Sequence, residues 1–237
     1  MVLVRDAEAA VNSALLRAEG YRLLGLALAY PADPEELRAE LAAAPAELDA
    51  IAGRLLPWLD DELPGEHARL FSQTTPVSPC EGHYFASDKG VLMGQLAKLY
   101  ELFGARVGGS ERESADHVGV EVEFAALLSV KEALALDAGA EAEESLAVTR
   151  RARQVFMQEH LGRFTDELGA RLSESSRHPF YAVLGEVLAR WVAADLAASG
   201  FCVERKADAA RRSLPVVAPE PDELTCGMGG VPSSSLG

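Results

Sequence analysis

The sequence predicts an all-α fold, on three observations. Alanine, leucine and glutamate dominate the 237 residues and aromatic residues make up only 6% of them, a composition that favours helix over strand. Apolar residues recur at helical spacing along most of the chain. Prolines and glycines interrupt this pattern at intervals typical of helix ends. We therefore expect a single helical domain of seven or eight helices over residues 1–205.

The predicted helices follow one another with short connections. Pro31 ends the first helix, and Asp33-Pro34-Glu35-Glu36 is typical of the next helix start, with a cap, a proline and acids in the first turn. A long proline-containing loop is expected over residues 72–87, and a kink at Gly162. The pattern predicts helices over residues 6–30, 34–44, 45–56, 66–71, 89–103, 116–136, 141–175 and 180–199.

The predicted helix over residues 116–136 is apolar on nearly all sides, and we expect it to be central. Phe124 and Leu128 share one stripe of this helix, and His117 lies in the same stripe. Ser114 is the expected N-cap, and Asp116 in the first turn suits the positive end of the helix dipole.

Beyond Lys206 the composition shifts to proline, glycine and serine, and helical periodicity ends. Residues 206–237, which include Cys226, are therefore predicted to form a flexible tail.

The charge balance limits the kinds of partner that the protein can bind, and the apolar runs and cysteines indicate its compartment. Lys and Arg number 22 and Asp and Glu number 37, giving a net charge of −15, which argues against nucleic acid or an anionic membrane as a partner. No apolar run is long enough to span a membrane, and the first residues lack the pattern of a secretory signal. Three cysteines fit a reducing compartment. A cytoplasmic protein with no stable membrane association is expected.

The sequence offers little for metal, cofactor or catalytic chemistry. Cys80 and His83 have a C-x-x-H spacing, but no second ligand pair follows, so neither a metal nor a cofactor is expected. No nucleophile elbow or phosphate-binding glycine loop occurs. Asp116 and His117 project about 100° apart on a helix, so they do not form a simple catalytic dyad. The pair has either a capping role or a binding role, and a small-molecule or nucleotide-binding protein that uses it is the alternative function.

Six short motifs occur in an order and spacing that resemble one protein family. They are Glu66-x-x-Arg69-Leu70-Phe71, Pro79-x-Glu81-x-x-Tyr84, Tyr100 before a glycine, Asp116-His117-Val118-x-x-Glu121-x-x-Phe124, Phe156-x-x-x-His160-Leu161 and Phe180-Tyr181. The resemblance that they carry extends over residues 18–198. The chain thus resembles the TorD/DmsD/NarJ family of redox-enzyme maturation chaperones, which are nitrate reductase delta subunit-like proteins.

The resemblance implies an all-α, non-enzymatic chaperone for a molybdopterin-containing oxidoreductase. Family members bind the N-terminal segment of the catalytic subunit, often a twin-arginine signal peptide, and delay export until the cofactor is inserted. The implied partner is therefore the precursor of that subunit with its leader peptide, and the chaperone would be a monomer or homodimer. Tyr30-Pro31 is similar to the nitrate-reductase branch, whereas the loop around Pro79 is closer to the TorD/DmsD branch, so the client stays open.

The family's peptide site corresponds here to the Asp-His pair and the proline loop. A twin-arginine peptide presents two guanidinium groups and then an apolar stretch, so its receptor needs carboxylates beside an apolar wall. The residues expected to bind the peptide are Asp116, His117, Glu121, Glu123, Phe124, Pro79, Glu81, Tyr84, Leu70 and Phe71. Gly82 stands where the family usually has Ser or Thr. The acidic surface would attract a basic peptide.

Overall fold

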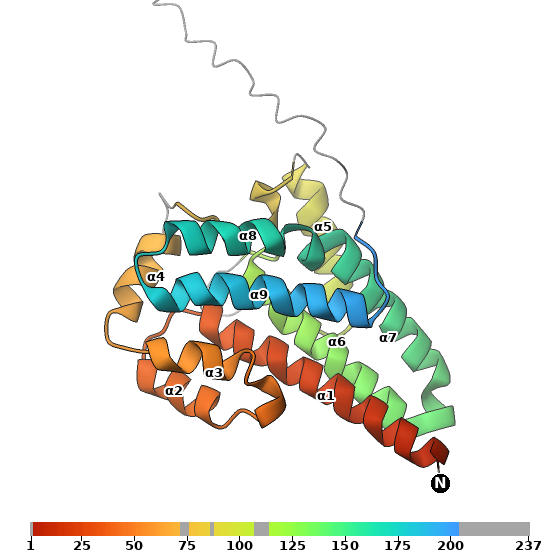
Figure 1. Cartoon of the computed structure of the whole chain (residues 1–237). Coiled ribbons are helices and arrows are strands. Elements are labelled where there is room, and N and C mark those ends of the chain that lie inside the picture. The colour runs from red at the N-terminus through yellow and green to blue at the C-terminus, as the bar shows by residue number, and fades with distance from the viewer. Residues whose placement is uncertain (1, 72–75, 86–87, 107–113, 204–237) are drawn as a thin grey trace, which may run out of the picture. The chain divides into compact units, whose positions relative to one another are not determined.

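The computed structural model describes residues 2–71, 76–85, 88–106 and 114–203, with side chains from residue 6 onward (Figure 1). Regular structure in these residues is helical apart from one isolated bridge, which confirms the predicted all-α fold. The helices are α1 (Val2–Leu28), α2 (Pro34–Ala42), α3 (Ala52–Leu55), α4 (Leu63–Phe71), α5 (Lys89–Leu102), α6 (Val118–Ala138), α7 (Glu143–Phe156), α8 (Gly162–Ser175) and α9 (Pro179–Ala198).

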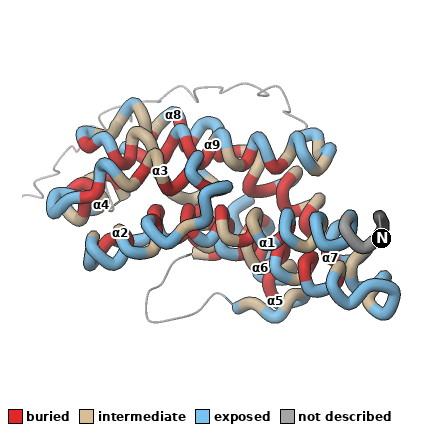
Figure 2. Tube along the Cα trace, turned by 60° about the horizontal axis from the view of Figure 1, so that its bottom comes forward, coloured by how far each residue is buried: buried red, intermediate tan, exposed pale blue. Residues whose placement is uncertain are grey.

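Two helix pairs have the most extensive contacts in the compact unit Met1–Glu204. Helix α1 packs along α6, and α8 packs along α9 (Figure 1). The buried positions of the helices face a continuous core, shown in red in Figure 2. The largest fully buried side chains include Tyr21, Tyr100, Phe156, Phe164 and Tyr181. The predicted tail, residues 206–237, lies outside the described residues.

Two glycines bring the α8 and α9 backbones close together. A Cβ atom at Gly169 would collide with the carbonyl oxygen of Gly185, and a Cβ atom at Gly185 would collide with that of Gly169. Both residues are buried, so the close approach lies within the helix–helix interface. Any larger side chain at either position would force the two helices apart.

Several predicted helix ends are confirmed. The Asp33 carboxylate accepts a hydrogen bond from the backbone N–H of Glu35 (2.9 Å) and caps α2. Gly104 follows α5 with a φ of 76°, a left-handed conformation that glycine adopts at little cost. The prediction for residues 45–56 is wrong, because only Ala52–Leu55 is α-helical there. Short 3-10 turns flank this segment, since Pro57 prevents a longer helix.

The start of the central helix also differs from the prediction. His117, and not Ser114, is the N-cap of α6, because its Nδ1 atom accepts a hydrogen bond from the N–H of Gly119 (3.1 Å). Asp116 therefore precedes the helix, and His117 does not belong to its apolar stripe. A histidine is not among the usual capping residues, so sequence preference alone favours the serine.

A local change of helix type lies directly before Gly162, where the sequence predicts a kink, and α7 and α8 run in different directions on its two sides (Figure 1). Residues Met157–Leu161 form one turn of π-helix between α7 and α8. Such turns insert an extra residue into an otherwise continuous helix and often occur at functional sites. Here the turn carries His160, which is buried.

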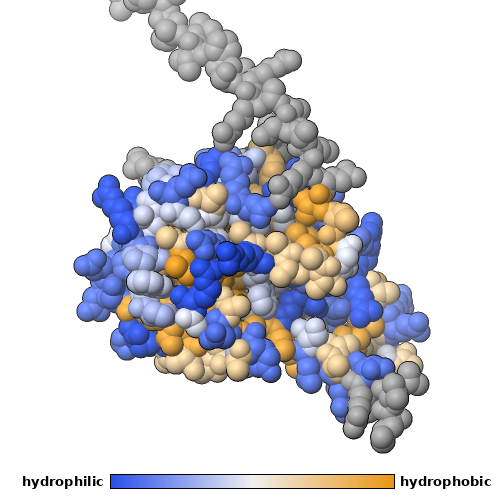
Figure 3. Space-filling model, viewed as in Figure 1, coloured by the Kyte–Doolittle hydropathy of each residue, from blue (hydrophilic) through white to orange (hydrophobic). Residues whose placement is uncertain are grey.

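The surface is mixed in character. Figure 3 shows hydrophilic residues over much of one face, with separate hydrophobic patches among them. Within the described residues, no helix has both the length and the apolar character required to cross a bilayer.

Candidate functional site

The proline loop pairs with the segment that leads into α6. Cys80 and His117 form an isolated antiparallel bridge. The N–H of Glu81 donates to the carbonyl oxygen of Asp116 (2.8 Å), and the N–H of Val118 donates to that of Pro79 (2.9 Å). These bonds bring together two motifs that lie far apart in the sequence.

The buried Asp116 carboxylate holds this loop in place through hydrogen bonds. One oxygen accepts a hydrogen bond from the Ser114 hydroxyl, and the other accepts one from the N–H of Gly82 (3.2 Å). A Cβ atom at residue 82 would lie only 3.1 Å from that second oxygen. Gly82, which departs from the family pattern, thus suits the close contact between the loop and the Asp116 carboxylate.

Three carboxyl groups and one imidazole gather beneath the loop, and we call Glu81, Asp116, Glu121 and His160 the acidic cluster. All four side chains are buried. The Oε2 atom of Glu81 lies 3.1 Å from Nδ1 of His160. Because a carboxylate only accepts hydrogen bonds, Nδ1 carries the hydrogen in this contact.

Glu121 is the member of the acidic cluster that has no hydrogen-bonding partner. Among the described residues, neither oxygen of its carboxyl group accepts or donates a hydrogen bond. Burial raises the pKa of this carboxyl well above its usual range, and the nearby Glu81 and Asp116 carboxylates raise it further. The neutral, protonated form of Glu121 is therefore favoured.

Glu81 and His160 also line a groove between α5 and the π-helical turn, which we call the α5 groove. Its volume is about 490 Å³. The lining residues are Glu81, Phe85, Asp88, Val91, Leu92, Gln95, Lys98, Leu99, Leu102, Val155, Glu159, His160 and Arg163. Two apolar side chains of the wall are strongly exposed, Val91 (57%) and Leu102 (70%). The guanidinium of Arg163 lies over the Phe85 ring, 4.0 Å from its centre.

The structure brings together only some of the residues predicted to bind peptide. Those of the loop and its partner segment are neighbours, namely Pro79, Glu81, Tyr84, Asp116, His117 and Glu121. The Tyr84 hydroxyl donates to the carbonyl oxygen of Ser78 (2.7 Å), and its ring packs against Phe164. Phe124 is buried in the core between the rings of Tyr100 and Phe156.

The other predicted residues lie elsewhere. Phe71 belongs to a separate aromatic group on α4 and α9, where its ring packs against His67 and Tyr181. Its neighbour Leu70 is fully buried. Glu123 is exposed on the side of α6 that faces Gly25 of α1. None of these three residues lines the α5 groove.

Burial changes the role that the predicted carboxylates can have. In this conformation the carboxylates of Glu81, Asp116 and Glu121 are 1% exposed or less, so a peptide arginine on the surface does not reach them. The direct ion pairs expected from the sequence are therefore not available to these three. Nor does the alternative of a small-molecule site at Asp116 and His117 gain support, since the Asp116 carboxylate is occupied by its own loop.

Sequence reasoning missed the residues of the α5 groove. His160 belongs to one of the six motifs, but nothing in its position along the predicted helix indicates that it lies beside Glu81. Of the exposed carboxylates of the groove, Asp88 lies in no motif, and Glu159 occupies an unspecified position of the motif that begins at Phe156. Within the described residues, no group of three or more His, Cys, Asp or Glu side chains is arranged to hold a metal ion.

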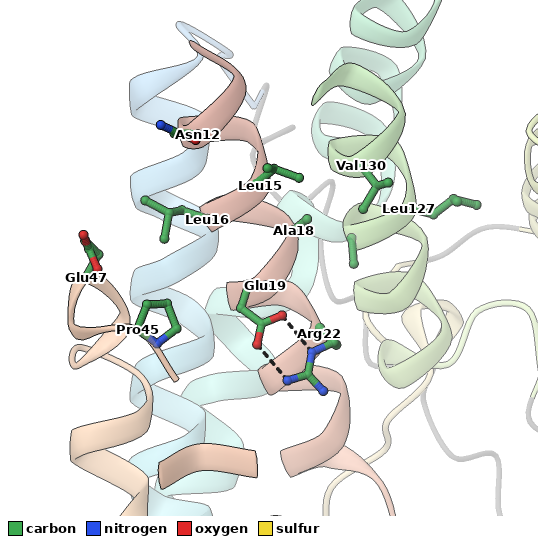
Figure 4. Close-up of a pocket in the computed structure, with 11 residues that line it drawn as sticks. Asn12, Leu15, Leu16, Ala18, Glu19, Arg22, Pro45, Glu47, Leu127 and Val130 are labelled. Carbon is green, nitrogen blue, oxygen red and sulfur yellow. Dashed lines mark hydrogen bonds and ion pairs between the residues drawn. The ribbon is translucent and has the colours of Figure 1, made fainter. Parts of the chain in front are cut away.

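A second groove lies between α1 and α6, beside Pro45 (Figure 4). Its walls are mainly apolar, with Leu15, Leu16 and Val130 among them, and its volume is about 650 Å³. The paired charges of Glu19 and Arg22 lie at one end (Figure 4). It contains none of the residues predicted to bind peptide.

Comparison with known proteins identifies the class to which this fold and site belong. The sequence pattern of the nitrate reductase delta subunit family matches residues 34–169, more than half of the chain, and the chain belongs to that family. The match includes the whole acidic cluster and the α5 groove.

One curated relative is the selenate reductase assembly chaperone protein of Thauera selenatis. It is 32% identical over 99 residues, which are 41% of this chain and 49% of the relative. The matched segment thus spans about half the length of that relative.

Proposed function

We propose that the protein is a non-enzymatic assembly chaperone of the cytoplasm. Its partner would be the precursor of a molybdopterin-containing reductase catalytic subunit, recognised by its N-terminal leader before export. The family supports this proposal, as does the relative named as a selenate reductase assembly chaperone. Nucleic acid is not the expected partner of a chain with a net charge of −15.

The α5 groove is the proposed leader-binding site, and one observation carries this assignment. Val91 and Leu102 expose apolar surface beside the exposed carboxylates of Asp88 and Glu159. A leader with arginines followed by an apolar stretch would place its guanidinium groups on these carboxylates and its apolar side chains on α5.

The acidic cluster has a supporting role in this proposal. Its hydrogen bonds fix the proline loop against the start of α6, and Glu81 and His160 form the inner end of the groove. The motif residues Pro79, Tyr84 and His117 would then border the site, and a contact with the leader stays a prediction for each of them.

Calorimetric titration with a synthetic twin-arginine leader tests the proposal. We expect saturable binding that weakens with salt, because exposed ion pairs are screened. Since an exposed ion pair contributes roughly 0.2–1 kcal/mol, the double variant Asp88→Asn/Glu159→Gln, which removes two of them, should bind about 2- to 30-fold more weakly. Asp116→Ala is a poor test, because it also removes the bonds that hold the loop.

Glu174→Gln is the matched control, since Glu174 is an exposed carboxylate on α8 outside the groove. It should bind the leader as tightly as the wild type. Equal affinities for the control and for the double variant would remove the α5 groove from the proposal. Absence of saturable binding to any such leader would instead point to the folded part of the client as the ligand.

A further inference from the structure

A second group of charged side chains joins α1, α6, α7 and α9. Unlike the acidic cluster, it consists of ion pairs between guanidinium and carboxylate groups. Glu132 contacts three guanidinium groups, those of Arg17 (2.5 Å), Arg150 (2.9 Å) and Arg153 (3.2 Å). Arg153 also pairs with Asp195, at 3.0 Å. We call Arg17, Glu132, Arg150, Arg153 and Asp195 the arginine network.

A cavity of about 620 Å³ opens beside this network. Four arginines line the cavity: the three that contact Glu132, and Arg151. Glu132 is the only carboxylate among the lining residues. Even when Asp195 is included, four guanidinium groups face two carboxylates. This local positive excess is unexpected in a chain with a net charge of −15.

The guanidinium groups of the cavity also keep unused donors. Arg150 and Arg151 each use one nitrogen in a hydrogen bond among the described residues, Nε to Glu132 and Nη1 to Gln154. Arg153 contributes, after burial, to lowering the pKa of Arg17, as expected for like charges held close together. The remaining N–H groups of Arg150 and Arg151 can therefore bind a ligand.

We propose that this cavity binds a small polyanion with phosphate or carboxylate oxygens. Arginine is suited to both, because its planar donors pair with two oxygens at once. The volume lies in the usual range for small-molecule sites, about 300–1,000 Å³. Phe201, Leu136 and Ala147 contribute apolar surface to the wall, which also contains the polar side chains of Ser13, Gln154 and Ser199. The site is separate from the α5 groove and does not depend on leader binding.

Isothermal titration of the full-length protein with pyrophosphate, and separately with citrate, tests this site at constant ionic strength. Saturable binding with a Kd below about 1 mM is expected for at least one of them. Tighter binding of pyrophosphate identifies a phosphate ligand and tighter binding of citrate a carboxylate ligand, while equal affinities support a site for polyanions in general.

Arg150→Gln and Arg151→Gln are the informative variants, because both side chains reach solvent and neither is needed for the core. Each should weaken binding of the probe about 10- to 150-fold, the usual effect of losing one charged hydrogen-bonding group. Arg177→Gln removes the same charge from an exposed position outside the cavity and should leave the affinity unchanged.

Two results would overturn the site: no binding of either probe at about 10 mM, or binding that survives both cavity variants. Leader affinity should be the same in Arg150→Gln and wild type. Failure of the anion site and failure of the leader-binding groove are thus measured independently.

Discussion

The acidic cluster and the arginine network bury charge in opposite ways. In the arginine network each carboxylate contacts at least one guanidinium, so the charges persist as ion pairs. In the acidic cluster Glu81 and Asp116 have hydrogen-bond donors, whereas Glu121 has none and depends on keeping its proton. The first arrangement is therefore sensitive to loss of a side chain, and the second is sensitive to pH.

The largest expected effect comes from breaking the arginine network. Arg153→Met removes the closest guanidinium partner of Asp195 and one of the three guanidinium contacts of Glu132, and removal of one member of a buried ion pair costs about 3–5 kcal/mol. Urea unfolding of the variant would measure this loss. Arg151→Gln, two residues away and exposed, should change stability by less than about 0.5 kcal/mol. Similar stabilities for the two variants would show that the network contributes no more than a surface charge.

A smaller effect is expected at Glu66, whose carboxylate accepts several hydrogen bonds. Glu66 belongs neither to the acidic cluster nor to the arginine network. Its carboxylate accepts hydrogen bonds from Arg69 (2.7 Å) and from the N–H of Arg177 (2.6 Å), which holds the turn between α8 and α9. Glu66→Gln should lose roughly 1.5–3 kcal/mol at pH 7, the usual contribution of hydrogen bonds to a charged group. Exposed Glu62→Gln is the control.

The pH dependence at Glu66 has a defined direction. The hydrogen bond with Arg69, the largest influence, lowers the pKa of Glu66 to about 2. A lowered pKa stabilises the fold above the ordinary value of 4.5, and this contribution is lost as the pH falls from 4.5 towards 2. The difference in Tm between wild type and Glu66→Gln should shrink over that interval. A constant difference would contradict the assignment.

The smallest effect is expected at Glu121, and its sign is opposite. A raised pKa means that the unfolded chain releases this proton at a lower pH than the folded chain, so wild-type stability falls as the pH rises above the ordinary range. Glu121→Gln stays neutral and should become more stable than wild type at pH 8, with little difference at pH 5. Chemical unfolding at the two pH values measures this change.

Glu123→Gln provides the comparison on the same helix, because Glu123 is exposed. It should show no gain with pH. Loss of stability in Glu121→Gln at pH 8 would mean that the charged carboxylate is needed, and the contrast between the two buried groups would disappear.

The sequence was sufficient for the fold because its signals are local. Asp33 with Pro34 predicts a helix start, and a glycine such as Gly104 predicts an end, from chemistry within one turn. The helix predicted over residues 45–56 failed for a different reason, since apolar spacing does not distinguish a continuous α-helix from the short 3-10 turns that flank Ala52–Leu55.

The candidate site was predicted less well because it depends on tertiary contacts. The motifs did identify Glu81, Asp116 and Glu121 as residues that belong together. They could not show that these carboxyl groups are buried, because an exposed and a buried acid have the same sequence signal. Glu159 and Leu102 were missed because their importance comes only from the neighbouring element across the groove.

The π-helical turn Met157–Leu161 also determines the direction in which the side chains of α8 point around the helix axis. One extra residue advances the later side chains by about 100° around the helix axis. Helix α7 can then face α6 while α8, which follows the turn, faces α9. Deleting one residue from this turn would restore an even period and rotate Phe164 and Leu168 away from the core. A single inserted residue thus lets α7 and α8 pack against different helices, and it places His160 beside Glu81.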